Sequence, residues 1–272
     1  MPLVKKAYIL YKKADAEKNG VLINKYIFAL RRHGLSGSLV IMDRLSDEEI
    51  FSHVSDAELV INRSRESGTV RYLEERGIRV SNPSVLNETA NDKLLTYERL
   101  SAHVPMLDTY LLSDGVRLPF PFVAKPAGGH GGAGVTLVRD ENDLLKYRAA
   151  HPEKSVVQPV ASEVGRDMRV YVIGGRPVAA MLRVSDTDFR SNYSLGGKAN
   201  FIPLTELRGD ERSIVRTVSD LIPVDYAGVD IMRDKGRAVL NEIEDPVGAR
   251  MLYTYTDIDP AELHIEYLIS KE

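Results

Sequence analysis

The stretch KPAGGHGGAGV, residues 125–135, places five glycines within seven residues, shortly after Lys125. A β-rich run at 120–126 leads into the glycines, and the short, β-branched run 134–138 follows them. We therefore expect a glycine loop that joins two strands. Glycine has no side chain to obstruct close approach, so the backbone N–H groups of such a loop can lie over phosphate oxygens. The loop alone is also compatible with a mobile hairpin that binds nothing.

Residues 129–134 match the G-x-G-x-x-G spacing of dinucleotide-binding loops, but the context differs. That loop opens a helix whose N-terminus receives the pyrophosphate, whereas a strand is expected after this one. A P-loop requires a Lys-Ser/Thr pair after its glycines, and none follows here. In protein kinases the lysine comes after the glycine loop and H-R-D and D-F-G elements follow, whereas Lys125 precedes the loop and neither element is present. A flap between two strands remains.

The first 85 residues alternate short apolar runs with helical patterns. A helix is expected over 20–33, where apolar residues recur at helical spacing and Gly34 follows as a stop signal. This alternation predicts an α/β lobe with a parallel open sheet. The expected strands of this lobe are 7–11, 38–42, 57–64 and 78–83.

The pattern changes after residue 82. One or two helices are expected up to about residue 100, and three apolar runs after the flap suggest an antiparallel block, interrupted by a polar stretch up to Pro203. The runs of this block are 156–160, 168–175 and 177–184. A helix near 210–221, strands at 226–232 and 238–243, and a last helix from about Pro260 are expected to follow.

Composition excludes several classes of function. The chain of 272 residues has a net charge of −3, so no global basic field recruits nucleic acid. It has no cysteine, which excludes thiol nucleophiles, thiolate metal sites and disulfides. No apolar run approaches the roughly 18 residues of a membrane span, and the N-terminus does not resemble a signal peptide. A cytoplasmic enzyme or binding protein is expected.

A polar stretch at 188–199 brings Arg190, Asn192 and Lys198 close together in the sequence, and Arg183 lies just upstream. A guanidinium and an amide are natural ligands of phosphate oxygens. A solvated loop with scattered charges is the alternative interpretation.

An acidic cluster lies in a predicted hairpin around the turn 234–236. A three-residue loop would place Asp230 opposite Leu240, and Asp230, Glu242 and Glu244 would then share one face. Three carboxylates on one face repel one another unless a cation lies among them, and oxygen ligands suit Mg²⁺ or Mn²⁺. The alternative is an acidic strand face that points into solvent.

These motifs occur in the order of a known family. The chain resembles the ATP-grasp superfamily, and within it the RimK-like carboxylate–amine ligases, over roughly residues 85–250. The most specific matches are GRDMRVYV (165–172) and the segment that begins DFRSN (188–192). The resemblance implies an α/β ATP-grasp fold with an N-terminal pre-ATP-grasp domain at 1–85, a small lobe with the flap at 86–157 and a C-terminal lobe with the metal site at 158–272.

The resemblance also implies roles for individual residues. The flap would close over the phosphates of ATP, and backbone groups of the hinge 158–160 would bind adenine. The implied nucleotide-binding residues are Lys93, Lys125, Gly128, Gly129, Gly131, Gly132, Gly134, Gln158, Pro159, Val160, Asp167, Arg190, Ser191 and Asn192. The implied catalytic residues are Arg169, Arg183, Arg190 and Asn192, and the implied ligands of Mg²⁺ or Mn²⁺ are Asp230, Glu242 and Glu244.

The implied chemistry has two steps. A substrate carboxylate attacks the γ-phosphate of ATP, and an amine then displaces phosphate from the acyl-phosphate. The acid is expected to be a small molecule or a peptide, and the amine an amino acid. A dimer or tetramer is typical of the family. An ATP-grasp kinase that phosphorylates a hydroxyl group and a non-catalytic nucleotide-binding protein remain alternatives.

The sequence departs from the family at its last metal-binding segment. The family pattern is Glu-x-Asn, two small residues and Pro-Gly, whereas this chain has Glu242-Ile-Glu244-Asp-Pro246-Val-Gly248. The extra charge of Glu244 would tighten metal binding or change the metal preference, unless Glu244 is not a ligand. The sequence does not identify the substrates.

Overall fold

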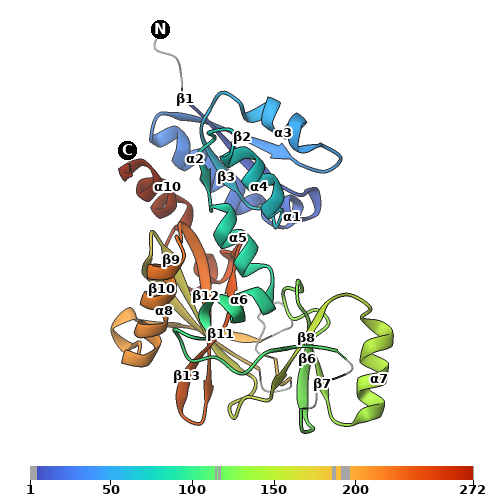
Figure 1. The fold of residues 1–272 in the computed structure, drawn as a ribbon. Helices are drawn as coiled ribbons and strands as arrows, with labels where there is room; N and C mark the ends of the chain where they lie inside the picture. The colour runs from blue at the N-terminus through green and yellow to red at the C-terminus, as the bar shows by residue number, and fades with distance from the viewer. Residues whose placement is uncertain (1–4, 114, 116–117, 186–187, 191–196, 272) are drawn as a thin grey trace.

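The computed structural model describes residues 5–113, 115, 118–185, 188–190 and 197–271, and Figure 1 shows how they are arranged. The described residues form three sheets: a parallel sheet near the N-terminus and two antiparallel sheets below it. The predicted α/β class is confirmed.

The N-terminal sheet is parallel, as predicted, with the strand order β2-β1-β3-β4. Side chains alternate between its faces, so Ile9 and Tyr11 pack toward α2 and α10 while Leu10 packs toward α3 and α4. The elements of this lobe are β1 (Lys5–Tyr11), α1 (Lys13–Lys18), α2 (Gly20–Arg32), β2 (Leu35–Ile41), α3 (Asp47–Val54), β3 (Ala57–Asn62), α4 (Ser67–Glu74) and β4 (Val80–Ser81), with α10 (Pro260–Ser270) added from the end of the chain.

The sheet that carries the glycine loop has the order β5-β8-β6-β7. The loop joins β6 to the adjacent antiparallel strand β7, as predicted. The expected pairing of 156–160 with the later strands is wrong, because β8 pairs with β6 instead, for example Val157 with Ala124. An apolar run shows that a strand is buried but not which strand lies beside it. The elements are β5 (Tyr110–Leu111), β6 (Phe122–Pro126), β7 (Thr136–Val138), α7 (Glu141–Ala150) and β8 (Ser155–Pro159).

The third sheet is antiparallel, with the order β11-β10-β9-β12-β13. Its apolar face, which includes Val170 and Val229, packs against helices α5, α6 and α8. The predicted interruption up to Pro203 is wrong in part, because β11 lies inside it as an edge strand that pairs with β10. The elements are α5 (Ser84–Ala90), α6 (Lys93–Leu100), β9 (Arg166–Ile173), β10 (Arg176–Val184), β11 (Lys198–Ile202), a 3₁₀ turn (Leu204–Glu206), α8 (Gly209–Leu221), β12 (Tyr226–Asp234), β13 (Arg237–Glu244) and α9 (Arg250–Tyr255).

The β12–β13 hairpin corrects the predicted register. Its loop has two residues, Lys235 and Gly236, both with positive φ, and Asp234 pairs with Arg237. This register alone would turn Glu242 toward the apolar core. A bulge at Asn241 adds one residue to β13, so Asp230 pairs directly with Glu242. The bulge therefore restores the expected face, on the side away from Val229 and Ile243.

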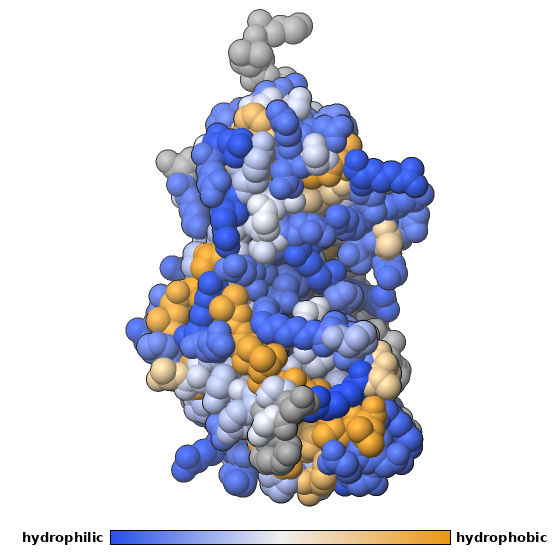
Figure 2. Space-filling view, turned by 45° about the vertical axis from the view of Figure 1, so that its right-hand side comes forward, coloured by the Kyte–Doolittle hydropathy of each residue, from blue (hydrophilic) through white to orange (hydrophobic). Residues whose placement is uncertain are grey.

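The surface of the view in Figure 2 is hydrophilic over most of the upper part and the waist, while apolar residues gather lower down. Within the described part of the chain, no helix combines the length and the apolar character that crossing a bilayer requires.

Candidate active site

A first cavity lies between the sheet that carries the flap and the end of the third sheet. Its volume is about 840 Å³, including space open to solvent. Apolar side chains such as Leu107, Val123 and Met232 form part of its wall, and Lys125 and Glu242 reach it as charged groups. The predicted residues that line it are Lys93, Lys125, Gly129, Gly132, Gln158, Pro159, Val160, Asp167, Arg190 and Glu242.

The remaining predicted flap residues, Gly128, Gly131 and Gly134, belong to the same loop but do not line the first cavity. Gly134 has a φ of +70°, and a Cβ atom there would lie 2.8 Å from Pro126, so the turn requires glycine. Two cations face the loop backbone: Lys93 Nζ donates to the carbonyl of Gly129, and Arg190 Nη1 donates to the carbonyl of Gly132. Both cations are therefore placed where phosphate oxygens beneath the loop would meet them.

Ser191 and Asn192 lie outside the described residues. Gln158 lies on β8, and its side chain donates to the hydroxyl of Thr109 at 2.6 Å. This bond occupies one of its amide hydrogens, so the contribution of residues 158–160 to the first cavity depends largely on the backbone at the end of β8.

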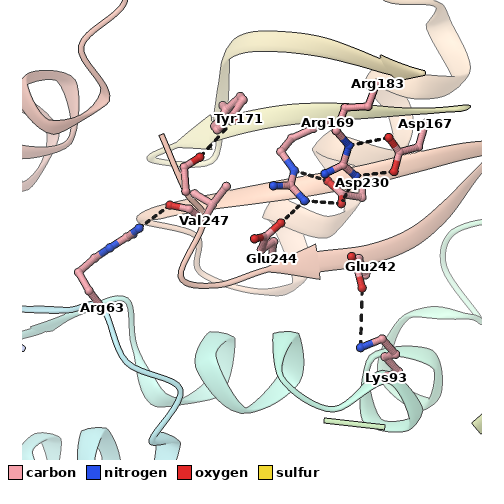
Figure 3. Close-up of polar contacts among 11 residues, drawn as sticks. Arg63, Lys93, Asp167, Arg169, Tyr171, Arg183, Asp230, Glu242, Glu244 and Val247 are labelled. Carbon is pink, nitrogen blue, oxygen red and sulfur yellow. Dashed lines mark hydrogen bonds and ion pairs between the residues drawn. The ribbon is translucent and has the colours of Figure 1, made fainter. Parts of the chain in front are cut away.

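Lys125 is almost completely buried on β6, beneath the flap. Burial, together with the nearby charge of Lys93, lowers the pKa of Lys125 to about 8, and Glu242 only partly opposes this. Lys93 Nζ lies 3.8 Å from Glu242 Oε2 (Figure 3). An anion beneath the flap would relieve the repulsion between these two lysines.

A buried network of ion pairs connects four neighbouring strands, β10, β9, β12 and β13 (Figure 3). Arg169 on β9 donates to both carboxylate oxygens of Asp230 on β12, at 2.8 and 2.6 Å, and also contacts Glu244 on β13. Arg183 on β10 donates to Asp167, and its Nη2 lies 2.6 Å from Asp230 Oδ2. Two guanidinium groups thus hold three carboxylates in fixed positions.

The network determines the charge of its members. Burial alone would raise the pKa of Asp230, but Arg169 and Arg183 lower it to about 2. Burial and the neighbouring carboxylates of Asp230 and Glu242 raise the pKa of Glu244 against the attraction of Arg169. Because three carboxylates surround two guanidiniums, the network has room for further positive charge.

The three predicted metal ligands are close in the sheet but do not converge on one point. The cluster of three potential metal ligands found in the described residues, His33, Glu262 and Glu266, lies elsewhere. Both oxygens of Asp230 are bonded to guanidiniums, whereas Glu242 borders the first cavity and Glu244 the second. Glu242 and Glu244 are thus the predicted metal ligands that open toward the cavities.

A second cavity, of about 1570 Å³ including open solvent, lies between the N-terminal lobe and the third sheet. Arg169, Arg183 and Glu244 line it, and the flap residues His130 and Gly131 border it. His130 borders the first cavity too, so the flap separates the two spaces.

Sequence reasoning missed most of the second cavity. Arg63 and Arg65 follow the buried strand β3, and Arg250 lies at the start of α9. One signal was available for the first two, because ligands of parallel sheets commonly bind at the carboxyl ends of strands. Arg250, and Met232 in the first cavity, carried no comparable signal.

We expect the variant Arg169→Met to lose about 3–5 kcal/mol of unfolding free energy, because it leaves the buried carboxylate of Asp230 with only one guanidinium. Chemical denaturation at pH 7 measures the loss. Arg176→Met, at an exposed position on the neighbouring strand β10, is the control and should change stability by no more than about 0.5 kcal/mol. Equal stabilities of the two variants would contradict the role of the network.

The wild-type protein should also lose stability in acid for the same reason. The pKa of Asp230 is depressed, so its contribution is complete above the ordinary value of 3.8 and is lost as the pH falls toward 2.

Comparisons with known proteins agree with this geometry. Residues 98–268 match the family of RimK-like ATP-grasp domains. The Mycoplasma pneumoniae protein named MG011 homolog is 29% identical over 254 residues, which cover 91% of this chain and 86% of that protein. β-Citrylglutamate synthase B from Homo sapiens is 34% identical over 218 residues, covering 74% of this chain and 55% of that relative, which is thus about twice as long as the matched part.

The structure of D-alanine–D-alanine ligase from Bacillus anthracis complexed with ATP has a TM-score of 0.73 to this chain, with 14% identity and 98% of both chains covered. At this identity the likeness concerns the fold alone, and it confirms the expected ATP-grasp fold. The expected enzyme class, an ATP-dependent ligase that forms C–N bonds, agrees with the family and with the names of its members. The chain belongs to the RimK-like ATP-grasp family.

Proposed function

We propose that the protein joins a carboxylic acid to an amine through an acyl-phosphate, with release of ADP and phosphate. The observation that carries this proposal is the position of β13, where Glu242 borders the first cavity and Glu244, two residues further on, borders the second. A nucleotide in the first cavity and an acid in the second would therefore meet at one strand. The name of the relative β-citrylglutamate synthase B supports an acid and an amine as the substrates.

ATP is proposed to bind in the first cavity. Its base would lie among the apolar side chains near Met232, next to the end of β8. Because Pro159 has no N–H group, the backbone donor to adenine would be Val160 or a neighbour. The phosphates would then extend beneath the flap toward Lys93 and Lys125. Asp167, which also lines this cavity, is proposed to belong to the nucleotide site, and Ser191 and Asn192 are proposed on sequence grounds.

A divalent cation such as Mg²⁺ suits the oxygen groups at this junction, where it would neutralise phosphate charge. Glu242 and Glu244 would hold it, because their carboxylates open to the two cavities. We leave Asp230 out of the ligand set, because two guanidiniums already occupy its oxygens. Asp230 would instead fix Arg169 in place.

The arginines are proposed to act on the acid and on the transferring phosphoryl group. Arg169 and Arg183 line the second cavity close to Glu244, and their ion pairs prevent them from changing position. Their charge would orient the carboxylate, one oxygen of which attacks the γ-phosphorus while the bond to ADP breaks. An amine would then attack the acyl carbon and expel phosphate. Arg190, at the flap, would stabilise the charge on the phosphoryl oxygens.

The experiment that tests this function is a screen of the full-length protein with Mg-ATP, pooled small carboxylic acids and pooled amino acids. ADP and free phosphate are measured separately, and products are identified by mass. We expect equal amounts of ADP and phosphate together with one condensed product. ADP with a stable phosphate ester and no free phosphate would contradict the ligase and identify a kinase.

A variant with an inactivated junction serves as the control for this screen. Glu242→Gln should keep its fold, because the side chain borders a cavity, but should lower turnover by about 100-fold or more, since charge neutralisation at a transferring phosphoryl group contributes several kcal/mol. Unchanged turnover would show that Glu242 has no part in the reaction.

Binding of ATP should depend on pH through Lys125. Because the pKa of Lys125 is about 8 without ligand, affinity should be greatest below pH 8 and should fall as the pH rises toward 9.5, where the free protein lacks the ammonium charge. Calorimetric titration with a non-hydrolysable ATP analogue measures this and also the uptake of a proton on binding above pH 8.

The matched variant Lys125→Met should bind the analogue about 1.5–3 kcal/mol more weakly and without this pH dependence. An exposed lysine of α7, Lys146, provides the control Lys146→Met, which should behave as the wild type. A wild-type affinity that stays constant from pH 7.5 to 9.5 would contradict the role of Lys125.

A further inference from the structure

The second cavity carries positive charge beyond the two arginines of the ion-pair network. Lys18, Arg63, Arg65 and Arg250 also line it, and Asp15 is the carboxylate of its lining outside the network. Asp15 lies 3.1 Å from Arg65 and so neutralises one of these charges. The concentration of positive charge is local, because the whole chain carries a net charge of −3.

The topology places these groups at a position where parallel sheets bind ligands. The chain leaves β1 toward β2 on one side and later returns to β3 on the other side, so the strand order reverses between β1 and β3. Tyr11 is the last residue of β1, and Arg63 and Arg65 follow the end of β3. All three line the second cavity. The carboxyl ends of strands at such a reversal form a crevice that receives ligands.

Arg63 gives independent evidence that the crevice receives an anion. The residue is only 2% exposed, and its Nη2 donates to the carbonyl of Val247 (Figure 3). Its Nε and Nη1 groups have no hydrogen-bond partner in the part of the chain that the structure describes, and neither has the hydroxyl of Tyr11. Asp245, a buried carboxylate, receives its hydrogen bonds from the amides of Asn82 and Asn87.

A buried guanidinium without a carboxylate partner is costly to maintain. The buried carboxylate of Asp245 feels this charge without contacting it, so the guanidinium is compensated only at a distance. The charge of Arg63 acts over several ångströms through the protein interior, where screening is weaker than in water. The part-exposed Arg65 lies at the rim of the same cavity and can reach a bound molecule directly.

We propose that Arg63 and Arg65 form an anion subsite for a second carboxylate of the substrate acid. This inference rests on the proposed function, because it places the reacting carboxylate near Arg169 and the second one at the carboxyl end of β3. Arg65 contacts the second carboxylate, and Arg63 supplies buried charge behind it. Both residues lie outside the matched domain at 98–268, so the N-terminal lobe selects the acid.

The test compares acids that differ only in this second group. Diacids from malonate to adipate and the monoacids of equal chain length, propionate to hexanoate, are titrated into the full-length protein saturated with Mg²⁺ and a non-hydrolysable ATP analogue. At least one diacid should bind tenfold or more tightly than its monoacid, as expected for one added charged hydrogen bond. If no diacid binds more tightly than its matched monoacid, the subsite is refuted.

Variants of Arg65 and Arg63 test whether these residues cause the preference for diacids. Arg65→Gln should remove the preference for the diacid but leave the affinity for the ATP analogue and for monoacids unchanged, whereas the exposed control Arg216→Gln on α8 should keep it. Arg63→Lys should retain part of the preference and Arg63→Met should lose it. If Arg65→Gln keeps the preference, or if inorganic phosphate binds as tightly as the diacid, the proposal is overturned.

This binding assay does not depend on turnover, so the two proposals can fail separately. A diacid preference that Arg65→Gln removes, in a protein that yields no condensed product, would support the subsite and count against the ligase. Ligation of monoacids as readily as diacids would support the ligase and count against the subsite.

Discussion

The contact between Arg169 and Asp230 is the interaction on which the rest of the site depends. It joins two adjacent strands through two hydrogen bonds, and Arg183 and Glu244 extend it to the strands on either side. A pair this deeply buried adds little stability compared with a well-packed apolar pair, but loss of one partner is costly. Its benefit is position, because the charges that line the second cavity cannot rotate away.

The flap and β13 lie at the boundary between the two cavities, which remain separate but adjoin there. The flap borders both, and β13 presents Glu242 to one and Glu244 to the other. The position of Glu242 at the first cavity depends on the bulge at Asn241. Without this bulge, Glu242 would face the apolar core. A single extra residue in a strand thus decides whether Glu242 borders the first cavity or faces the core.

The parts of the fold that follow from local pattern could be predicted from the sequence. The parallel sheet of the N-terminal lobe follows from alternating strands and helices, and the flap from the glycines after Lys125. The partner of β8 and the bulge at Asn241 could not be predicted, because each depends on contacts between distant segments. Arg63 follows an expected strand, which was an available signal, but only the folded sheet shows that this strand lies at a reversal of strand order. Asp230, Glu242 and Glu244 were predicted to share one face, but the ion pairs of Asp230 with Arg169 and Arg183 could not be predicted, because sequence gives charges without their partners.

In the reaction we propose, an acid in the second cavity receives the γ-phosphoryl group before it meets the amine. Transfer of ¹⁸O from the carboxylate of the acid tests this most directly, with the acid that the substrate screen identifies. We expect each released phosphate to carry one labelled oxygen and the amide to keep the other. Unlabelled phosphate alongside a labelled product would contradict it, because the carboxylate would then never have attacked ATP.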